Sequence, residues 1–420
     1  MSANVMCVSS ASGLPIFSRK KGNAENLPFS TIGSLNGVHM FGKPINLEVL
    51  NTVTEDYSVA WKEYHDCVKI IGIASGCSVE ILTKLLDSVF SAVVLIVGLE
   101  EIKSQRNIER LKRELRVCYP IIDRLLDSLD CGDSTNKNSS DLVGLAEVIL
   151  CTENHLIQIV LDSFTECVDS MFSSILIHGK VATATESWWN LHPDEIKLLS
   201  ILANSENSNI SKDIPVFLPY KSPTVAFRFV ALKLISDVQL CCLCGPAPVL
   251  KDIEHSATQC FKSSADIFAT AVQCHPRNFP SSTQLDSSIL GFLLLNTSQG
   301  KYVISKNPQQ NSTKKPASSS HRLDILRTFF YQAVTCFLVT EDFKIENSNY
   351  KETSKDQLDV DDLNIGTETY WCSEYHKCHA MKINDNILCV LYGSSVPTHA
   401  MRLITEKTLK MLISDKQVCW

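Results

Sequence analysis

Cysteine and histidine gather at two places where they could hold a metal ion. The first is the run Cys241-Cys242-Leu243-Cys244. Because neighbouring side chains of a strand point to opposite faces, only Cys242 and Cys244 could share one ion, and no second close pair follows them. The interpretation we favour is a buried apolar strand whose thiols pack as small hydrophobic groups.

The second cluster is Cys372, His376, Cys378 and His379. If this stretch is a single strand, alternation places Cys372, His376 and Cys378 on one face and His379 on the other. That arrangement would give three zinc-type ligands and an open fourth position. Since Cys and His also pack and titrate without a metal, packing is the alternative, and we predict no metal and no cofactor.

The sequence lacks four motifs that are typical of common enzyme classes. A phosphate-binding loop, a dinucleotide fingerprint, a nucleophile elbow and a paired-histidine zinc helix are all missing. The triplet His65-Asp66-Cys67 has the residue types of a nucleophilic triad. In a strand, however, His65 and Cys67 share a face and Asp66 points away. We therefore predict no catalytic residue and no enzymatic chemistry of the chain's own.

One basic stretch stands out in an acidic chain of formal charge −7. Lys103, Arg106, Arg110 and Arg113 lie in or next to a predicted helix, and Glu109 can pair with Arg113 on its surface. Docking to an acidic partner surface or to a phosphoinositide headgroup is the other interpretation. The negative charge, without an aromatic and arginine-rich sheet, argues against nucleic acid as a partner.

Two predicted helices carry apolar residues that could bind a partner. Trp188 and Trp189 are neighbours, so they cannot both face the core, and one is a candidate interface anchor. In the stretch from Pro28 to Phe41, we expect Asn36 and His39 to face solvent and the apolar residues to face a sheet. These apolar residues recur at every third position: Phe29, Ile32, Leu35, Val38 and Phe41.

The predicted elements repeat three times in the order strand, strand, helix, three strands, helix. A length of 420 residues fits about three domains at roughly 150 residues each. A helix over 107–129 should be kinked at Pro120. We predict these segments: a domain at 1–130, a polar linker at 131–141, a domain at 142–275 with an added N-terminal helix, and a domain at 286–420 with mobile insertions at 307–320 and 341–368.

Several segments resemble the Fuzzy family of planar cell polarity effectors, most closely in the first 250 residues. They include Leu27-Pro28-Phe29-Ser30, Val97-Gly98-Leu99-Glu100-Glu101, Ala184-Thr185-Glu186-Ser187-Trp188-Trp189 and Leu243-Cys244-Gly245-Pro246. The element order likewise resembles the longin fold. The resemblance implies an α/β protein of the α+β type, with three longin domains that are each an antiparallel five-stranded sheet flanked by helices.

The same resemblance implies a function and a set of partners. A subunit of this family would pair with Inturned through an exposed sheet edge, in a complex with a WD-repeat planar polarity effector and a Rab-family or Rab-like small GTPase. The pair would act as a guanine nucleotide exchange factor required for cilium assembly. The alternative is a non-catalytic scaffold that recruits the GTPase and intraflagellar transport cargo to the basal body.

We expect the chain in the cytoplasm, at the cytoskeleton and the ciliary basal body. Residues 1 to 12 lack the pattern of a signal peptide, which agrees with reduced thiols in the cytosol. The most hydrophobic window, Val89 to Leu99, has only about half the length of a membrane span.

Overall fold

The computed structural model describes residues 2–45, 47–104, 108–129, 142–204, 211–306, 319–338, 366–414 and 420. It divides into two compact units, Met1–His275 and Pro276–Trp420. The predicted linker at 131–141 lies outside the described residues, as do residues 307–318 and 341–365 of the predicted insertions. Within the described ranges, no helix is both long enough and apolar enough to cross a bilayer.

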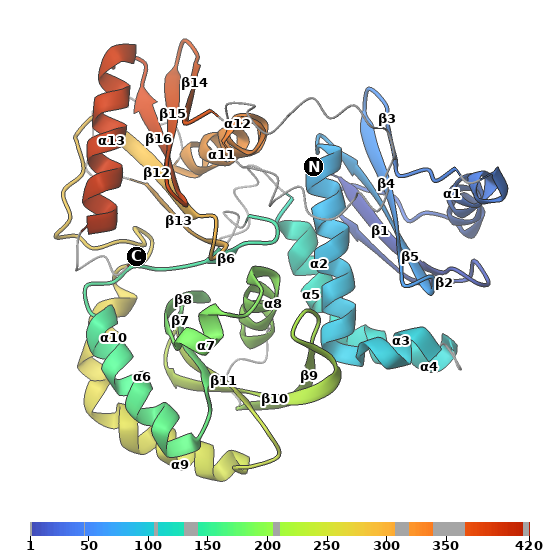
Figure 1. Cartoon of the computed structure of the whole chain (residues 1–420), viewed down its shortest axis with the longest axis horizontal. Coiled ribbons are helices and arrows are strands. Elements are labelled where there is room, and N and C mark those ends of the chain that lie inside the picture. Colours follow the sequence, from blue (N-terminus) through green and yellow to red (C-terminus); the bar gives the residue numbers. More distant parts are fainter. Residues whose placement is uncertain are drawn as a thin grey trace, which may run out of the picture. The chain divides into compact units, whose positions relative to one another are not determined.

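The first unit opens with an antiparallel sheet of five strands in the order β2-β1-β5-β4-β3. The helices α1 and α2 cover its opposite faces (Figure 1). Its elements are β1 Ala3–Ser9, β2 Pro15–Lys21, α1 Phe29–Gly42, η1 Lys43–Ile45, β3 Asn51–Val53, β4 Tyr57–Tyr64, β5 Val68–Ser75, α2 Val79–Val97, α3 Leu99–Ser104, α4 Ile108–Glu114, η2 Leu115–Cys118 and α5 Tyr119–Asp127.

Two details of these helices follow from local chemistry. The Ser78 hydroxyl caps α2 by accepting a hydrogen bond from the Ile81 amide at 3.4 Å, which satisfies a free donor of the first turn. The helix predicted over 107–129 is divided into α4, η2 and α5, which follow one another without a gap, and the 3-10 turn η2 ends just before Pro120, where the kink was predicted. Pro120 lies in the first turn of α5, where its missing N–H costs no hydrogen bond.

A second five-stranded antiparallel sheet, in the order β8-β7-β11-β10-β9, completes this unit. The helices α6 and α9 lie on one side of it and α8 on the other (Figure 1). Its elements are β6 Ala146–Glu147, α6 Asn154–Val168, β7 Phe172–Ile177, β8 Lys180–Ala184, α7 Glu186–Trp189, α8 Pro193–Ala203, β9 Lys212–Leu218, β10 Ser222–Ile235, β11 Val238–Cys244, α9 Leu250–Phe261, η3 Lys262–Ser264 and α10 Ala265–Val272.

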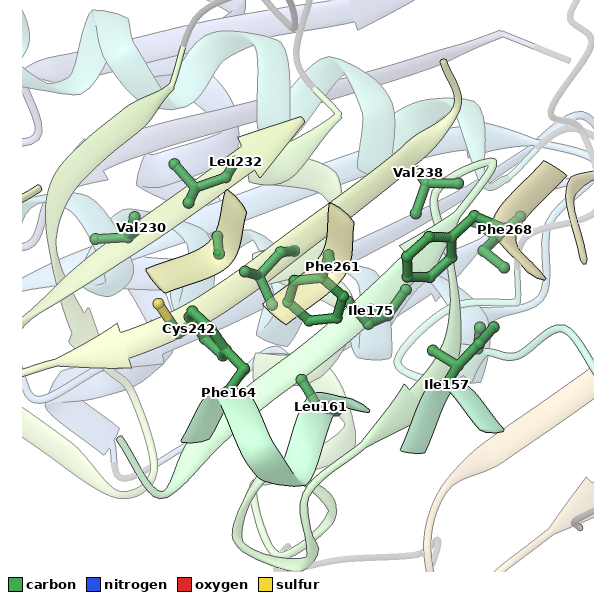
Figure 2. Close-up of a cluster of buried hydrophobic side chains, with 14 of the residues drawn as sticks. Ile157, Leu161, Phe164, Ile175, Val230, Leu232, Val238, Cys242, Phe261 and Phe268 are labelled. Carbon is green, nitrogen blue, oxygen red and sulfur yellow. The ribbon is translucent and has the colours of Figure 1, made fainter. Parts of the chain in front are cut away.

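A large hydrophobic cluster lies between this sheet and the helices α6, α9 and α10 (Figure 2). Phe164, Phe261 and Phe268 form a chain of aromatic contacts with ring centroids 5.7 and 5.8 Å apart. Each ring is buried, and complete burial of such a side chain contributes about 2 to 3 kcal/mol. Cys242 joins this cluster as an apolar group, as the strand interpretation predicts.

The second unit repeats the same plan. Its strands are antiparallel in the order β14-β15-β16-β12-β13, with α11 and α13 on opposite faces (Figure 1). The elements are β12 Ile289–Asn296, β13 Lys301–Lys306, α11 Ser319–Phe329, the π-helical turn η4 Phe330–Val334, α12 Thr335–Phe337, β14 Glu368–Cys372, β15 His376–Ile383, β16 Asn386–Gly393 and α13 Thr398–Ser414. The predicted fold class, three antiparallel sheets flanked by helices, is therefore confirmed.

Candidate functional site

The helix α1 leaves several apolar side chains exposed and buries two polar ones, contrary to the prediction, although Ile32 and in part Leu35 pack on the sheet as predicted. Ile32, Asn36 and His39 are buried, whereas Phe29 is 65% and Phe41 is 82% exposed. The reason is geometric. A helix turns by about 100° per residue, so three residues fall roughly 60° short of a full turn, and a strict period of three winds around the helix. Alternating spacings of four and three, as at Ile32, Asn36 and His39, stay on one face.

The strand β3 forms an open edge of the first sheet. All three of its residues are exposed, and Val53 is 63% exposed. It pairs with β4 on one side, and no described strand pairs with its other side. An edge with unpaired N–H and C=O groups can accept a strand of another chain.

Together these two elements define what we call the α1–β3 surface. It consists of exposed apolar side chains of α1, of the segment that follows and of β3: Phe29, Val38, Met40, Phe41, Leu47, Leu50 and Val53. Exposed apolar groups in this number, next to an unpaired strand, are typical of a protein interface.

The corresponding edge of the second sheet is not open. There, β9 lies against α2 of the first domain, and its residues Val216 and Leu218 are fully buried. Gly98 follows α2 at a φ of 83°, and a Cβ at this position would come within 2.9 Å of the Phe217 ring. The chain thus protects one sheet edge with its own helix.

A buried carboxylate joins the same two domains. The Ser88 hydroxyl of α2 donates a hydrogen bond of 2.6 Å to Asp194 in the first turn of α8. Burial raises the pKa of Asp194 above its ordinary value, although the Ser88 hydrogen bond and His192 act against that shift. The first two domains are therefore held together by a polar contact as well as by packing.

Three of the four predicted basic residues lie in described parts of the chain, and they are on the surface of the first domain. Lys103 on α3 and Arg113 on α4 are exposed, and Arg106 lies outside the described residues. Arg110 donates to Glu114 at 2.8 Å, and this pair raises the pKa of its guanidinium. Helix-surface pairing thus accounts for one of the four residues, and their role in docking stays a prediction.

Of the two tryptophans on α7, Trp188 is completely buried and Trp189 is half-buried. The prediction that they divide between core and surface agrees with this placement. A contact between Trp189 and a partner remains a prediction.

The first cysteine cluster is packed inside a sheet, whereas the second cluster is divided between buried and exposed positions, with Cys372 exposed. The Cys242 and Cys244 sulfur atoms are 3.6 Å apart on one face of β11, and both side chains are buried. The pKa of Cys244 is lowered to about 7, and the main cause is its interaction with Cys242. In the described part of the chain, no group of three or more His, Cys, Asp or Glu side chains could hold a metal ion.

The single strand that we expected around Cys372 is wrong. Ser373 begins a turn, with its amide bonded to the His376 carbonyl at 2.9 Å, so Cys372 on β14 is separated from Cys378 on β15. His379 is buried and lies 2.9 Å from the Thr405 hydroxyl. These residues therefore do not form the three-ligand face that strand alternation predicted.

Sequence reasoning missed the exposed face of α1 as a site. A signal was present in the spacing, because a strict period of three does not match a helix. The buried set at Ile32, Asn36 and His39 has the correct spacing but is mostly polar, so hydrophobicity alone could not identify it.

Comparison with known proteins agrees with this architecture. Family models for the first, second and third "Longin domain of FUZ, MON1 and HPS1" match residues 3–125, 168–262 and 288–416. The chain is 34% identical to Protein fuzzy homolog of Xenopus tropicalis over 420 residues, covering 98% of each chain. It is also 34% identical to Protein fuzzy homolog of Homo sapiens over 416 residues, covering 97% of each chain. The chain therefore belongs to the Fuzzy family of planar cell polarity effectors, and it carries three longin domains.

Proposed function

We propose that this chain pairs with a second longin subunit, Inturned, through the α1–β3 surface of its first longin domain. Two features of the first domain carry the proposal. The strand β3 is an open sheet edge, and the helix α1 exposes several apolar side chains. A partner strand on β3 would satisfy unpaired backbone groups, and a partner side chain on α1 would cover Phe41.

In this proposal the pair is a guanine nucleotide exchange factor for a Rab-family small GTPase and acts in cilium assembly at the basal body. Exchange requires only that the factor bind the GTPase more tightly in a conformation that holds nucleotide poorly. No acid, base or nucleophile is needed for such a reaction, and the sequence motifs of the common enzyme classes are absent from the chain. A WD-repeat subunit would complete the assembly.

The experiment is release of a fluorescent guanine nucleotide from a panel of Rab-family GTPases. Each GTPase is mixed with this chain alone, with Inturned alone and with both. Acceleration of one GTPase by the pair, and by neither subunit alone, would support a composite exchange factor. Stable three-way binding without acceleration would overturn the exchange activity and leave a scaffold that recruits the GTPase.

A further inference from the structure

We propose that His39 makes the attachment of α1 to the first sheet sensitive to pH, so that acidification below neutral loosens this helix. The consequence for partner binding rests on the proposed function. The effect on the helix itself does not, because it concerns the free chain.

His39 lies beneath α1 without a hydrogen bond. Its side chain is completely buried, and neither ring nitrogen has a hydrogen-bond partner. The Nε2 atom is 3.8 Å from a carboxylate oxygen of Glu48, which is 54% exposed and therefore well solvated. A buried imidazole in this position is stable as the neutral form, because burial without a bonded partner penalises charge.

Charged side chains of several neighbouring elements surround His39. The residue Lys69 of β5 is completely buried, and its Nζ donates to Asn36 Oδ1 of α1 at 3.0 Å. Glu63 of β4 is 2.5 Å from Lys43, which caps the end of α1. Glu63 is paired with Lys43 through one oxygen, its other oxygen is buried without a hydrogen-bond partner, and Glu48 is well solvated. Both carboxylates favour a charged His39, but burial and the charge of Lys69 outweigh them.

The direction of the pH dependence follows from these contacts. Burial, followed by the charge of Lys69, lowers the pKa of His39 below 6.5. A detached α1 would expose His39 to water and restore an ordinary pKa of about 6.5. The detached form then binds protons more tightly, so attachment is complete above this value and weakens as the pH falls toward the lowered pKa.

The apolar anchor that opposes this loosening is small. Of the fully buried side chains in α1, Ile32 is the large apolar one, while Asn36 and His39 are polar, and Leu35 is partly buried against the same cluster as Ile32. A further tie is the hydrogen bond of 3.0 Å from the Trp61 indole to the Leu35 carbonyl. A charge placed under α1 therefore acts on a helix with a small hydrophobic anchor, and the helix carries Phe29, Val38 and Phe41 of the α1–β3 surface.

The test is hydrogen exchange of the full chain at about pH 5.5 and about pH 7.5, corrected for intrinsic exchange rates. Peptides covering Phe29–Gly42 are compared with peptides covering the buried strand Val238–Cys244. We expect the protection of α1 to fall several-fold at the lower pH while the protection of β11 stays the same. Equal protection of α1 at both pH values would overturn the proposal.

Two variants separate His39 from general acid sensitivity. His39→Gln cannot gain a charge, so we expect it to remove the pH dependence of α1 protection. His192→Gln is the matched control, because burial also lowers the pKa of His192 and this residue lies in the second domain, so the loss at α1 should persist. An unchanged pH dependence in His39→Gln would contradict the proposal.

A measurement on the unaltered chain covers the case in which His39→Gln does not fold. An NMR titration of the His39 ring should give a pKa below the ordinary value, and a value at or above about 6.5 would overturn the proposal. Loss of α1 protection without loss of partner binding would instead contradict only the proposed role of α1 in binding.

Discussion

The edge strands β3 and β9 occupy the same place in two sheets of the same fold, and they differ in what covers them. In the second sheet, β9 buries Val216 and Leu218 and lies against α2. In the first sheet, every residue of β3 is exposed. The chain thus covers the edge strand of its second longin domain with the helix α2 of the first. Among the described residues, no helix or strand covers β3, the edge strand of the first domain.

Among single side-chain truncations, the largest effect on binding should come from Phe41, which is 82% exposed on α1. If this side chain is an interface anchor, Phe41→Ala should weaken binding to Inturned by about 2 kcal/mol, or roughly 30-fold. The matched control is Ile159→Ala on α6, a side chain that is 63% exposed and lies away from the α1–β3 surface. Calorimetry on both variants makes the comparison, and equal affinities for Phe41→Ala and the unaltered chain would remove α1 from the interface.

The contact that covers the edge strand β9 can be disturbed by mutation of Gly98 and Phe217. Gly98→Ala should destabilise the first two domains by about 2 kcal/mol, because an alanine at positive φ is strained and its Cβ would meet the Phe217 ring. Phe217→Ala removes that ring. In chemical denaturation the double variant should cost less than the sum of the single variants, since the clash is then absent. Strict additivity would mean that Gly98 and Phe217 are not coupled.

A smaller effect concerns the carboxylate between the two domains. The pKa of Asp194 is raised in the folded chain, so its ionisation opposes folding; the cost is absent below the ordinary pKa of 3.8 and grows as the pH rises through the raised value. Asp194→Asn can still accept the Ser88 hydrogen bond. We expect its thermal midpoint to exceed that of the unaltered chain by a few degrees at neutral pH and by less near pH 4. A constant difference across this range would argue against a raised pKa.

The smallest effect on the fold should come from the basic surface. Arg110→Glu with Arg113→Glu changes exposed residues of α4, so the stability of the free chain should hardly change. If this surface binds phosphoinositides, association with anionic vesicles should weaken several-fold. Equal association of both proteins with vesicles would leave helix-surface pairing as the explanation of these charges.

Local signals in the sequence were enough to predict most of the fold. Runs of β-branched residues located β4 and β5, and Ser78 located the start of α2. The orientation of α1 could not be predicted, because burial of Asn36 depends on Lys69, which lies 33 residues further along the chain. Contacts between residues distant in sequence decide such cases.

The candidate site was harder to predict for the same reason. Whether an edge strand is covered depends on other domains, as the contact between α2 and β9 illustrates. Their place at the sheet edge does not distinguish β3 from β9. The difference between them emerged only when the packing of α2 was known.

The central claim is that a partner strand pairs with β3, and edge prolines test it most directly. The Thr54 amide donates to the Tyr57 carbonyl, and the Trp61 amide donates to the Leu50 carbonyl. Backbone groups alternate in direction along a strand, so those of Thr52 also point to β4, while those of Asn51 and Val53 point to the open edge. Asn51→Pro with Val53→Pro therefore removes the outward donors and leaves the β4 ladder in place.

The binding of Inturned to this variant is compared with its binding to Asn51→Ala with Val53→Ala, which loses the same side chains but keeps the donors. The account predicts that the prolines abolish binding, that the alanines retain most of it, and that both free chains unfold at similar midpoints. Undiminished binding by the folded proline variant would contradict edge pairing.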